Sequence, residues 1–248
     1  MSKMWVVLAV GLVLLLSACT VNIIEGSGNV VTEDRVVASF DSISMAAFGE
    51  VIITQGSFDA VAVEAEDNLL QYIKTETRDG TLVIEFTGNA FSFQDGNSSL
   101  LRPTKPIKYY ITVDSLREIE VSGAGSVSAE TLSVGDLSLS VPGAGSITLR
   151  DVSASSISAS ISGAGGINVA GSTDTLFVEI SGVGGFVGKD LACRAAQVKV
   201  SSAGSAQVWA SDTLDISIAG AGSVEYWGDP VVTQDNSGVG TIVSKGDK

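Results

Sequence analysis

The sequence contains no histidine, only two cysteines and four prolines, and few basic residues. The absence of histidine excludes imidazole bases, Ser-His-Asp triads and histidine metal ligands. Twenty-eight acidic residues against 14 basic ones give a net charge of −14, with no basic run. Nucleic acids and anionic membrane surfaces attract basic proteins, so neither is an expected partner by charge. The 248 residues, 45% of them hydrophobic, are enough for one large domain or two small ones.

The first residues have the pattern of an export signal. Lys3 precedes an apolar run of about a dozen residues, which is too short to span a bilayer comfortably. The run ends in Leu16-Ser17-Ala18-Cys19, which resembles a bacterial lipoprotein box. We therefore expect residues 1–18 to be a signal peptide and Cys19 to be the lipidated N-terminus, carrying acyl chains such as palmitate. More than one acyl chain holds a protein stably on a membrane. A plain secretory signal is the alternative.

The predicted lipoprotein signal also constrains location and cysteine chemistry. With Cys19 lipidated, Cys193 has no disulfide partner, and with no histidine as a base we expect it to be a small, partly buried residue and not a nucleophile. Thr20 stands where some lipoproteins of the inner membrane carry aspartate. The expected location is therefore the bacterial cell envelope, with the outer membrane favoured.

A glycine-containing unit recurs through the second half of the chain, as residues 122–125, 142–145, 162–165, 181–184, 202–204, 219–222 and 237–240. The last glycine of each unit advances by 20, 20, 19, 20, 18 and 18 residues. Apolar residues between the units alternate with polar ones and return at the same phase. One such column is Val127, Ile147, Ile167, Phe186, Ala206, Val224 and Ile242, and another is Leu139, Ala159, Val178, Val198 and Ile216.

This pattern predicts an all-β fold, a right-handed single-stranded β-helix (β-solenoid) with roughly 20-residue coils. Alternation with period two indicates strands with one buried face, and equal phase in every repeat lets those faces stack into one core. The right-handed sense follows the preference of parallel crossovers. Glycines suit corners that need positive φ or close backbone approach. An antiparallel sandwich of short strands is the alternative, but it does not explain the constant phase.

The region before the repeats predicts strands at Val30-Val31, Phe40–Ile43, Val51–Thr54, Leu82–Phe86 and Ile107–Val113, with a long loop over residues 87–106. Gly49 is a candidate early corner, residues 66–73 favour one or two helical turns, and residues 77–81 favour a turn. At the far end, Asp235 and Asn236 occupy places where earlier coils have apolar residues, which predicts a polar terminal cap.

Several segments together resemble a known family. They are Gly26–Val30, Gly49–Gly56, Asp67–Leu70, Arg78–Ile84, Pro106–Tyr109 and the recurrent Ser-Gly-x-Gly units. The stretch from 28 to 244 resembles the "putative auto-transporter adhesin head GIN domain", and we take residues 19–27 as a tether before it. The resemblance implies a right-handed β-helix with glycine-rich corners, lipoprotein or secretion signals, and a role outside the cytoplasm. The aspartate common after the glycine unit in that family is replaced here, for example by Ser126 and Ser146.

The sequence does not favour catalysis. A calcium-binding β-roll needs a nonapeptide repeat with aspartate, which the 20-residue period contradicts. A carbohydrate-cleaving β-helix needs an acid/base constellation, and its candidates, at varying offsets from the glycines, are Glu130, Asp151, Asp174, Asp190 and Asp212. Aspartate at such places most often serves a turn. We therefore expect no catalytic residue, no metal and no cofactor.

Outward-facing residues offer a binding function. Phe177, Trp209 and Trp227 are candidate ligand-binding residues, because aromatic rings beside small serines can stack on sugars or anchor a protein. The alternative is that Trp227 caps the last coils and the serines form a solvated face. The sequence thus predicts a lipid-anchored envelope protein, an adhesin-like binding or structural module, with an envelope glycan or protein as ligand and an open oligomeric state. A polysaccharide-binding or polysaccharide-active β-helix is the alternative function.

Overall fold

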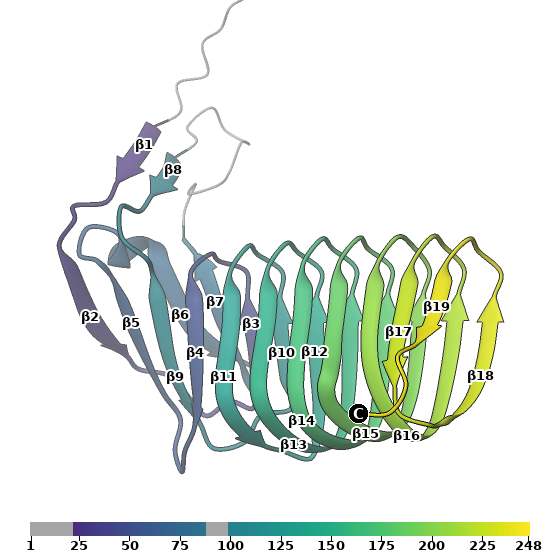
Figure 1. Cartoon of the computed structure of the whole chain (residues 1–248). Coiled ribbons are helices and arrows are strands. Elements are labelled where there is room, and N and C mark those ends of the chain that lie inside the picture. The colour runs from purple at the N-terminus through teal and green to yellow at the C-terminus, as the bar shows by residue number, and fades with distance from the viewer. Residues whose placement is uncertain (1–21, 88–98) are drawn as a thin grey trace, which may run out of the picture.

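The chain folds into a right-handed β-solenoid, seen as a rod in Figure 1. The computed structural model describes residues 22–87 and 99–248, so the predicted signal peptide and Cys19 lie outside the described residues. Each coil crosses two opposed parallel sheets. The chain passes between them through a glycine corner at one edge of the rod (the corner edge) and through a smooth bend at the other (the bend edge). The predicted fold class is confirmed.

We name the two sheets by their position relative to the corner. The post-corner sheet contains β9 (Lys108–Val113), β4 (Glu50–Gln55), β11 (Ser126–Ser133), the first parts of β13 (Ser146–Ile161), β14 (Gly166–Ile180), β15 (Gly185–Val200) and β16 (Ser205–Ile218), then β17 (Ser223–Trp227) and β19 (Thr241–Ser244). The pre-corner sheet contains β7 (Thr81–Phe86), β3 (Ser42–Met45), β10 (Glu118–Val121), β12 (Asp136–Val141), the last parts of β13 to β16, and β18 (Val231–Asn236).

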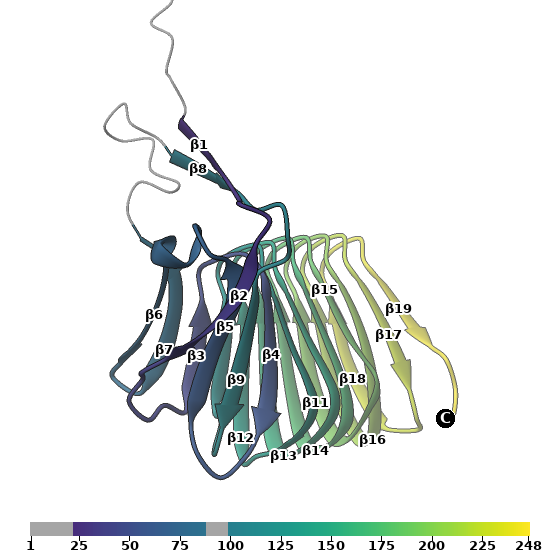
Figure 2. The ribbon, with the colours of Figure 1, turned by 90° about the vertical axis from the view of Figure 1, so that its left-hand side faces the viewer.

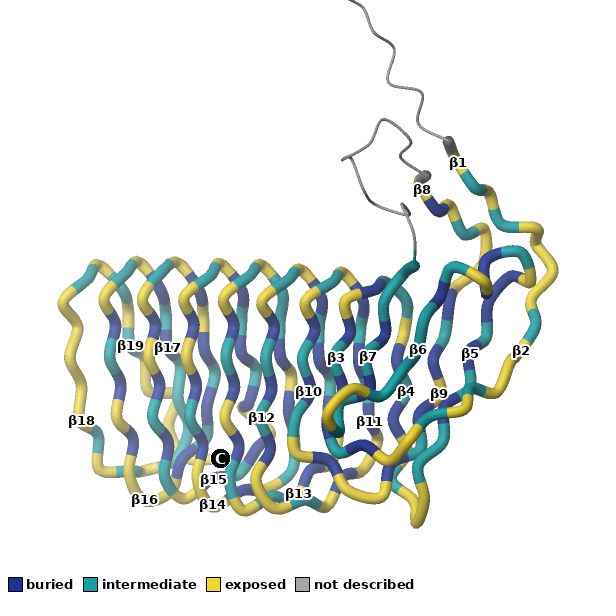
Figure 3. The backbone as a smooth tube through the Cα atoms, turned by 180° about the vertical axis from the view of Figure 1, so that it is seen from behind, coloured by how far each residue is buried: buried dark blue, intermediate teal, exposed yellow. Residues whose placement is uncertain are grey.

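The core is a stack of apolar columns between these sheets. Val127 pairs in register with Ile147, which pairs with Ile167, and the column continues to Ile242 as the sequence predicts. On the pre-corner sheet, Leu139 and Ala159 lie in register in the same way. Buried residues alternate along each strand with exposed or half-buried ones (Figure 3). Every neighbouring pair of strands from β10 onward is parallel, so the antiparallel sandwich is wrong.

The corner glycines are needed for close approach between coils. None of the glycines from Gly123 to Gly165 has a positive φ. A Cβ on Gly182 would collide with the Gly163 carbonyl oxygen of the preceding coil and lie 2.6 Å from the Ser162 carbonyl oxygen. Gly49 is an early corner as predicted, because residues 46–49 fall opposite residues 122–125, and it does have a positive φ of 120°.

At the N-terminal end, the spatial order of the coils differs from their order in the chain. β7 and β9 follow β3 and β4 in sequence, yet they form the outermost parallel coil. Antiparallel strands then close the two sheets: β6 (Ile73–Arg78) pairs with β7, β5 (Ala60–Glu66) pairs with β9, and β2 (Val30–Arg35) pairs with β5. A parallel edge open for further coils is therefore covered at this end.

Short elements complete this end of the rod. Asp79 and Gly80, with φ of 49° and 78°, make the predicted turn between β6 and β7. A single 3-10 turn, η1 (Leu70–Tyr72), stands where the sequence favours one or two helical turns. β1 (Asn22–Glu25) and β8 (Ser99–Arg102) form a two-stranded parallel ribbon that projects from the rod (Figure 2). β8 lies inside the segment predicted as a loop.

The last coil corrects one residue of the predicted cap. Asn236 lies opposite Ile218 in the apolar column, as expected, but Asp235 lies opposite the outward residue Ser217. The second polar residue in an apolar column is Gln234, opposite Ile216. The sequence reasoning misplaced it by one position, which moves a strand residue to the other face. Asn236 Nδ2 also donates a hydrogen bond to the Gly240 carbonyl oxygen at 2.8 Å.

Candidate ligand-binding groove on the bend edge

A groove of about 520 Å³ crosses successive coils at the bend edge. Its lining residues come from β11, the bend that follows it, and β13 to β16, and most are small or polar: Ser133, Val134, Ser153, Ala154, Ser155, Ser172, Thr173, Asp174, Ala192, Cys193, Arg194, Trp209 and Ser211. The lining residues recur because each coil contributes the same bend position. The groove therefore runs along the rod axis and not around it.

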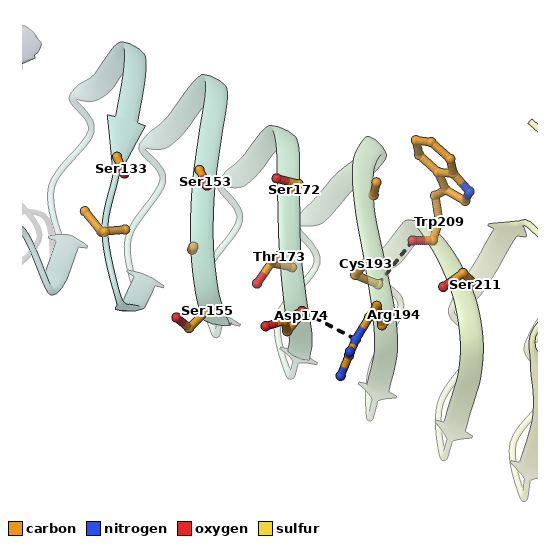
Figure 4. A pocket seen from close by; sticks show the side chains of 13 residues that line it. Ser133, Ser153, Ser155, Ser172, Thr173, Asp174, Cys193, Arg194, Trp209 and Ser211 are labelled. Atoms are coloured by element: carbon orange, nitrogen blue, oxygen red, sulfur yellow. Dashed lines mark hydrogen bonds and ion pairs between the residues drawn. The ribbon is translucent and has the colours of Figure 1, made fainter.

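One wall of the groove is a column of short side chains that ends at an indole. Ser133, Ser153, Ser172 and Ala192 lie in register on successive strands, and the next residue in the column is Trp209. Figure 4 shows the serines in a row with the Trp209 ring standing at their end. With strands about 4.8 Å apart, the row from Ser133 to Trp209 is about 19 Å long. This geometry suits an extended ligand.

A second tryptophan lies beside Trp209 on the post-corner sheet. Trp227 lies next to it in register on β17, and both side chains are half-buried. The Lys248 ammonium lies 5.0 Å from the centroid of the Trp209 ring, a cation–π contact. Two of the three predicted ligand-binding residues are thus brought side by side, at one end of the groove.

The third predicted residue lies elsewhere. Phe177 is half-buried on the pre-corner sheet, in a separate hollow of about 430 Å³ that Ser158 and Gln197 also line. The Lys199 ammonium lies 5.3 Å from its ring centroid. The structure does not bring Phe177 together with Trp209, because residues before and after the bend belong to different sheets.

The polar groups within the groove include an ion pair and a buried thiol. Asp174 and Arg194 form an exposed ion pair of 3.4 Å between neighbouring coils. Cys193 is a buried free thiol that donates a hydrogen bond to the Trp209 carbonyl oxygen at 3.1 Å. Burial, aided by the charge of Asp212, raises the pKa of Cys193 to about 12. The thiol therefore stays protonated at neutral pH and is a poor nucleophile.

Most of the candidate catalytic carboxylates have a partner of their own. Glu130 pairs with Arg150 at 2.9 Å, and Asp190 pairs with Lys248 at 2.5 Å. Asp212 accepts a hydrogen bond from the Ser211 hydroxyl at 2.6 Å, and Asp151 is exposed. Among residues 22–87 and 99–248, no three histidine, cysteine or acidic residues are grouped so that they could hold a metal ion. Glu130, Asp190 and Asp212 thus each interact with a different partner.

The sequence reasoning missed the serine column that lines the groove. The signal was present, since Ser133, Ser153 and Ser172 repeat with the period of the coils. It was overlooked because these residues lie at the bend, outside the alternating apolar segments. Arg194, which pairs with Asp174 across neighbouring coils, is a second lining residue that the sequence analysis did not single out.

Two of the family-like segments meet at the N-terminal end of the rod. Glu66 is 1% exposed and accepts hydrogen bonds from the backbone N–H groups of Gly28 at 2.7 Å and Thr104 at 2.8 Å. Its desolvation raises the pKa, but hydrogen bonds from Thr104 and Gly28 outweigh it, and the net pKa is lowered. Asp67 binds Ser27 and Asn29 through its side chain. These contacts, which we call the Glu66 clasp, fasten the start of the domain to β5.

Residues 39–230 match the family described as "Putative auto-transporter adhesin, head GIN domain". The chain belongs to this family. The match covers the coils as far as β17 and the closing strands β5 and β6, whereas β1, β2, β18 and β19 lie outside it.

Solved structures of similar shape support this GIN-domain assignment at the level of the fold. A "putative adhesin" of Bacteroides fragilis is 24% identical, with a TM-score of 0.82 over 89% of this chain and 99% of that one. A "putative lipid binding protein" of Parabacteroides distasonis is 26% identical, with a TM-score of 0.72 over 90% of this chain and 99% of that one. A "putative adhesin" of Parabacteroides merdae is 22% identical, with a TM-score of 0.68 over 90% and 99%. Comparison with curated proteins gives no match.

Two findings concern the relation of the protein to a membrane. Within the described part of the chain, no helix has the length and apolar character to cross a bilayer. The adhesin-like family indicates a protein of the cell surface or envelope.

Proposed function

We propose that this GIN-domain protein is a lipid-anchored, adhesin-like binding module of the bacterial envelope that binds its ligand in the bend-edge groove and performs no chemistry. The observation that carries the proposal is the groove itself: about 520 Å³, continuous over several coils, lined by hydroxyl groups and ended by an indole. A rigid solenoid holds these groups at fixed spacing, so binding needs little reorganisation. The family's adhesin-like character supports the same role.

The chemistry of the groove supports an extended polar ligand, an envelope glycan or a protein segment. Short serine side chains leave space for the ligand and supply donors and acceptors, while the Asp174–Arg194 pair adds both charges. An indole such as that of Trp209 can stack on a sugar ring or anchor an apolar side chain. Cleavage of a polysaccharide is not favoured, because the carboxylates are separated into individual pairs.

The lipid anchor is supported by the sequence before Thr20. Leu16-Ser17-Ala18-Cys19 has the small residues and the cysteine that lipoprotein processing needs. Cys193 is buried, so its thiol is not presented at the surface to a second cysteine. The absence of aspartate at Thr20 supports the outer membrane.

Ligand binding in the groove is tested with the mature protein extracted in detergent. Binding of this protein to a glycan array and to fractionated envelope proteins is measured in parallel with that of the single variants Trp209→Ala, Trp227→Ala and Phe177→Ala. Trp209→Ala removes the indole at the end of the groove, so we expect binding to weaken at least tenfold, a loss of about 1.4 kcal/mol or more. Phe177→Ala is the matched control, because it removes an aromatic ring of similar exposure from the other sheet.

Two outcomes contradict the groove assignment. Loss of binding in Phe177→Ala with retention in Trp209→Ala moves the site to the pre-corner sheet. Saturable binding to neither glycans nor envelope proteins leaves a structural role in place of a binding one. Circular dichroism of each variant checks that the β-solenoid is intact.

The anchor is tested separately. Wild type grown with radiolabelled palmitate is expected to carry the label and to sediment with outer membranes. Cys19→Ser is expected to lose both properties, because it removes the acylated sulfur. A wild-type protein that carries no label and remains in the periplasmic fraction rules out the anchor without affecting the groove.

A further inference from the structure

The two edges of the rod differ sharply in charge. The seven glycine corners of the repeat region contain no charged residue. The outermost residue of each corner is exposed and apolar: it is alanine in five corners, and Val183 and Val239, which are 68% and 84% exposed, in the other two. The bend edge, in contrast, carries Glu130 with Arg150 and Asp174 with Arg194. In a chain of net charge −14, seven successive corners without a charged residue form a distinct surface.

The β1–β8 ribbon stands on the same side of the rod as the corner edge (Figures 1 and 2). Ile23 and Leu100 pair directly in register and are 53% and 41% exposed, so they form an apolar pair on one face of the ribbon, and the exposed ion pair of Glu25 with Arg102 follows it on the same face. The other face is packed, because Leu101 is only 4% exposed and lies against Leu69. Scattered exposed apolar residues are common, but a register pair on a projecting ribbon is a localised surface.

The length of chain between the ribbon and the anchor limits where the ribbon can be. Ile23 is four residues after Cys19, and four extended residues span at most about 14 Å. This step rests on the proposed lipid anchor. If the acyl chains of Cys19 are in the bilayer, Ile23 is held within reach of the headgroup region, and an apolar residue there gains from leaving water.

We propose that the β1–β8 ribbon and the corner edge form a surface that contacts the lipid bilayer, so that the rod lies along the membrane with its groove facing away. The uncharged corner edge can approach an anionic surface, whereas the acidic faces of the rod are repelled. The bend edge lies on the opposite side of the rod from the ribbon (Figure 1). The bilayer contact thus displays the serine column and Trp209 to ligands in the aqueous phase.

The test measures which edge is near the lipid. Lipidated full-length protein, purified from membranes, is reconstituted on vesicles of phosphatidylethanolamine and phosphatidylglycerol in a Cys193→Ala background. An environment-sensitive fluorophore is attached at Ala164→Cys on the corner edge or at Ser155→Cys in the groove. Ser155 is in β13 and Ala164 is in the corner that follows β13, so the two probes are at a similar place along the rod. Doxyl-labelled lipids are expected to quench the probe at 164 at least threefold more than the probe at 155. Equal quenching, or stronger quenching at 155, overturns the proposal.

The ribbon is tested by Ile23→Asp combined with Leu100→Asp. Both side chains are exposed, so the fold is expected to survive. The double variant should still float with vesicles, because its lipid remains, but quenching at 164 should fall to the level at 155. Unchanged quenching shows that the ribbon does not orient the rod and overturns the proposal. A wild-type protein that fails to float identifies failure of the anchor, and the orientation falls with it.

Discussion

The tight stacking of the corners makes a quantitative prediction for Gly182→Ala. The added methyl group would collide with the Gly163 carbonyl oxygen and lie 2.6 Å from the Ser162 carbonyl oxygen, whereas an ordinary contact is 3.4 Å or more. The coil must therefore move away from its predecessor by about 1 Å or more, because the obstacle is backbone and cannot rotate aside. This close approach is the reason for glycine here, since the φ of Gly182 is not positive.

The cost follows from what that movement breaks. Val183 donates a backbone hydrogen bond to the Gly163 carbonyl oxygen at 3.0 Å, and Ser181 donates one to the Ile161 carbonyl oxygen at 2.9 Å. Losing both costs about 1–3 kcal/mol and overpacking adds about 1–3 kcal/mol, while the stiffer unfolded chain returns about 0.4–1 kcal/mol. The expected net destabilisation is about 3 kcal/mol, equivalent to a fall in Tm of about 6–12 °C.

Urea unfolding of the mature protein, followed by the fluorescence of Trp209 and Trp227 and by circular dichroism, measures this loss. Gly166→Ala is the matched control, because the nearest atom to its added methyl group is the Gly185 carbonyl oxygen at 3.5 Å. That variant should lie within about 1 kcal/mol of wild type. If Gly182→Ala is as stable as Gly166→Ala, close approach is not why the corners contain glycine.

Three further predictions follow from the environments of individual side chains. Cys193 should resist a thiol reagent at pH 8 in the folded protein and react at once in urea, because its pKa is raised to about 12 by burial; rapid labelling of the native protein would contradict that burial. Glu66→Gln should destabilise by about 2 kcal/mol at pH 7. Since the folded pKa of Glu66 lies below its ordinary value of 4.5, the stability that the carboxylate contributes is complete above that pH and is lost as the pH falls through the folded pKa, so the urea midpoints of variant and wild type should converge as the solution is acidified. Arg150→Gln should change stability by less than about 0.5 kcal/mol, because its ion pair with Glu130 is exposed, and a larger loss in the same urea assay would show a role that the surface pair does not explain.

Much of the rod could be predicted because its repeat is local and periodic. Coils of nearly equal length place Val127 over Ile147 and Leu139 over Ala159 without any knowledge of the tertiary structure. The same phase places Phe177 and Trp209 on different sheets, since Phe177 follows its glycine by 12 residues and Trp209 follows its own by 5. That separation was available in the sequence and was missed, because the aromatic residues were considered by type and not by position in the coil.

The arrangement at the N-terminal end depends on pairings that have no local signal. β3 pairs with β10, although Met45 and Val121 are 76 residues apart, and β7 enters on the other side of β3. Nothing in the strands themselves distinguishes these partners from others of similar pattern, because β-sheet preference reflects the neighbours a strand acquires. The Glu66 clasp is likewise formed only when distant backbone N–H groups meet a buried carboxylate.

The sequence by itself determined the coil length, the phase of the apolar columns and the places of the corners, because each depends on residues a few positions apart. Only the tertiary structure decided that the corner glycines serve close contact between coils, that serines of successive bends line one groove, and that the ribbon shares a side with the uncharged edge. Those features arise where coils meet, and a contact between coils exists only once the chain has been wound.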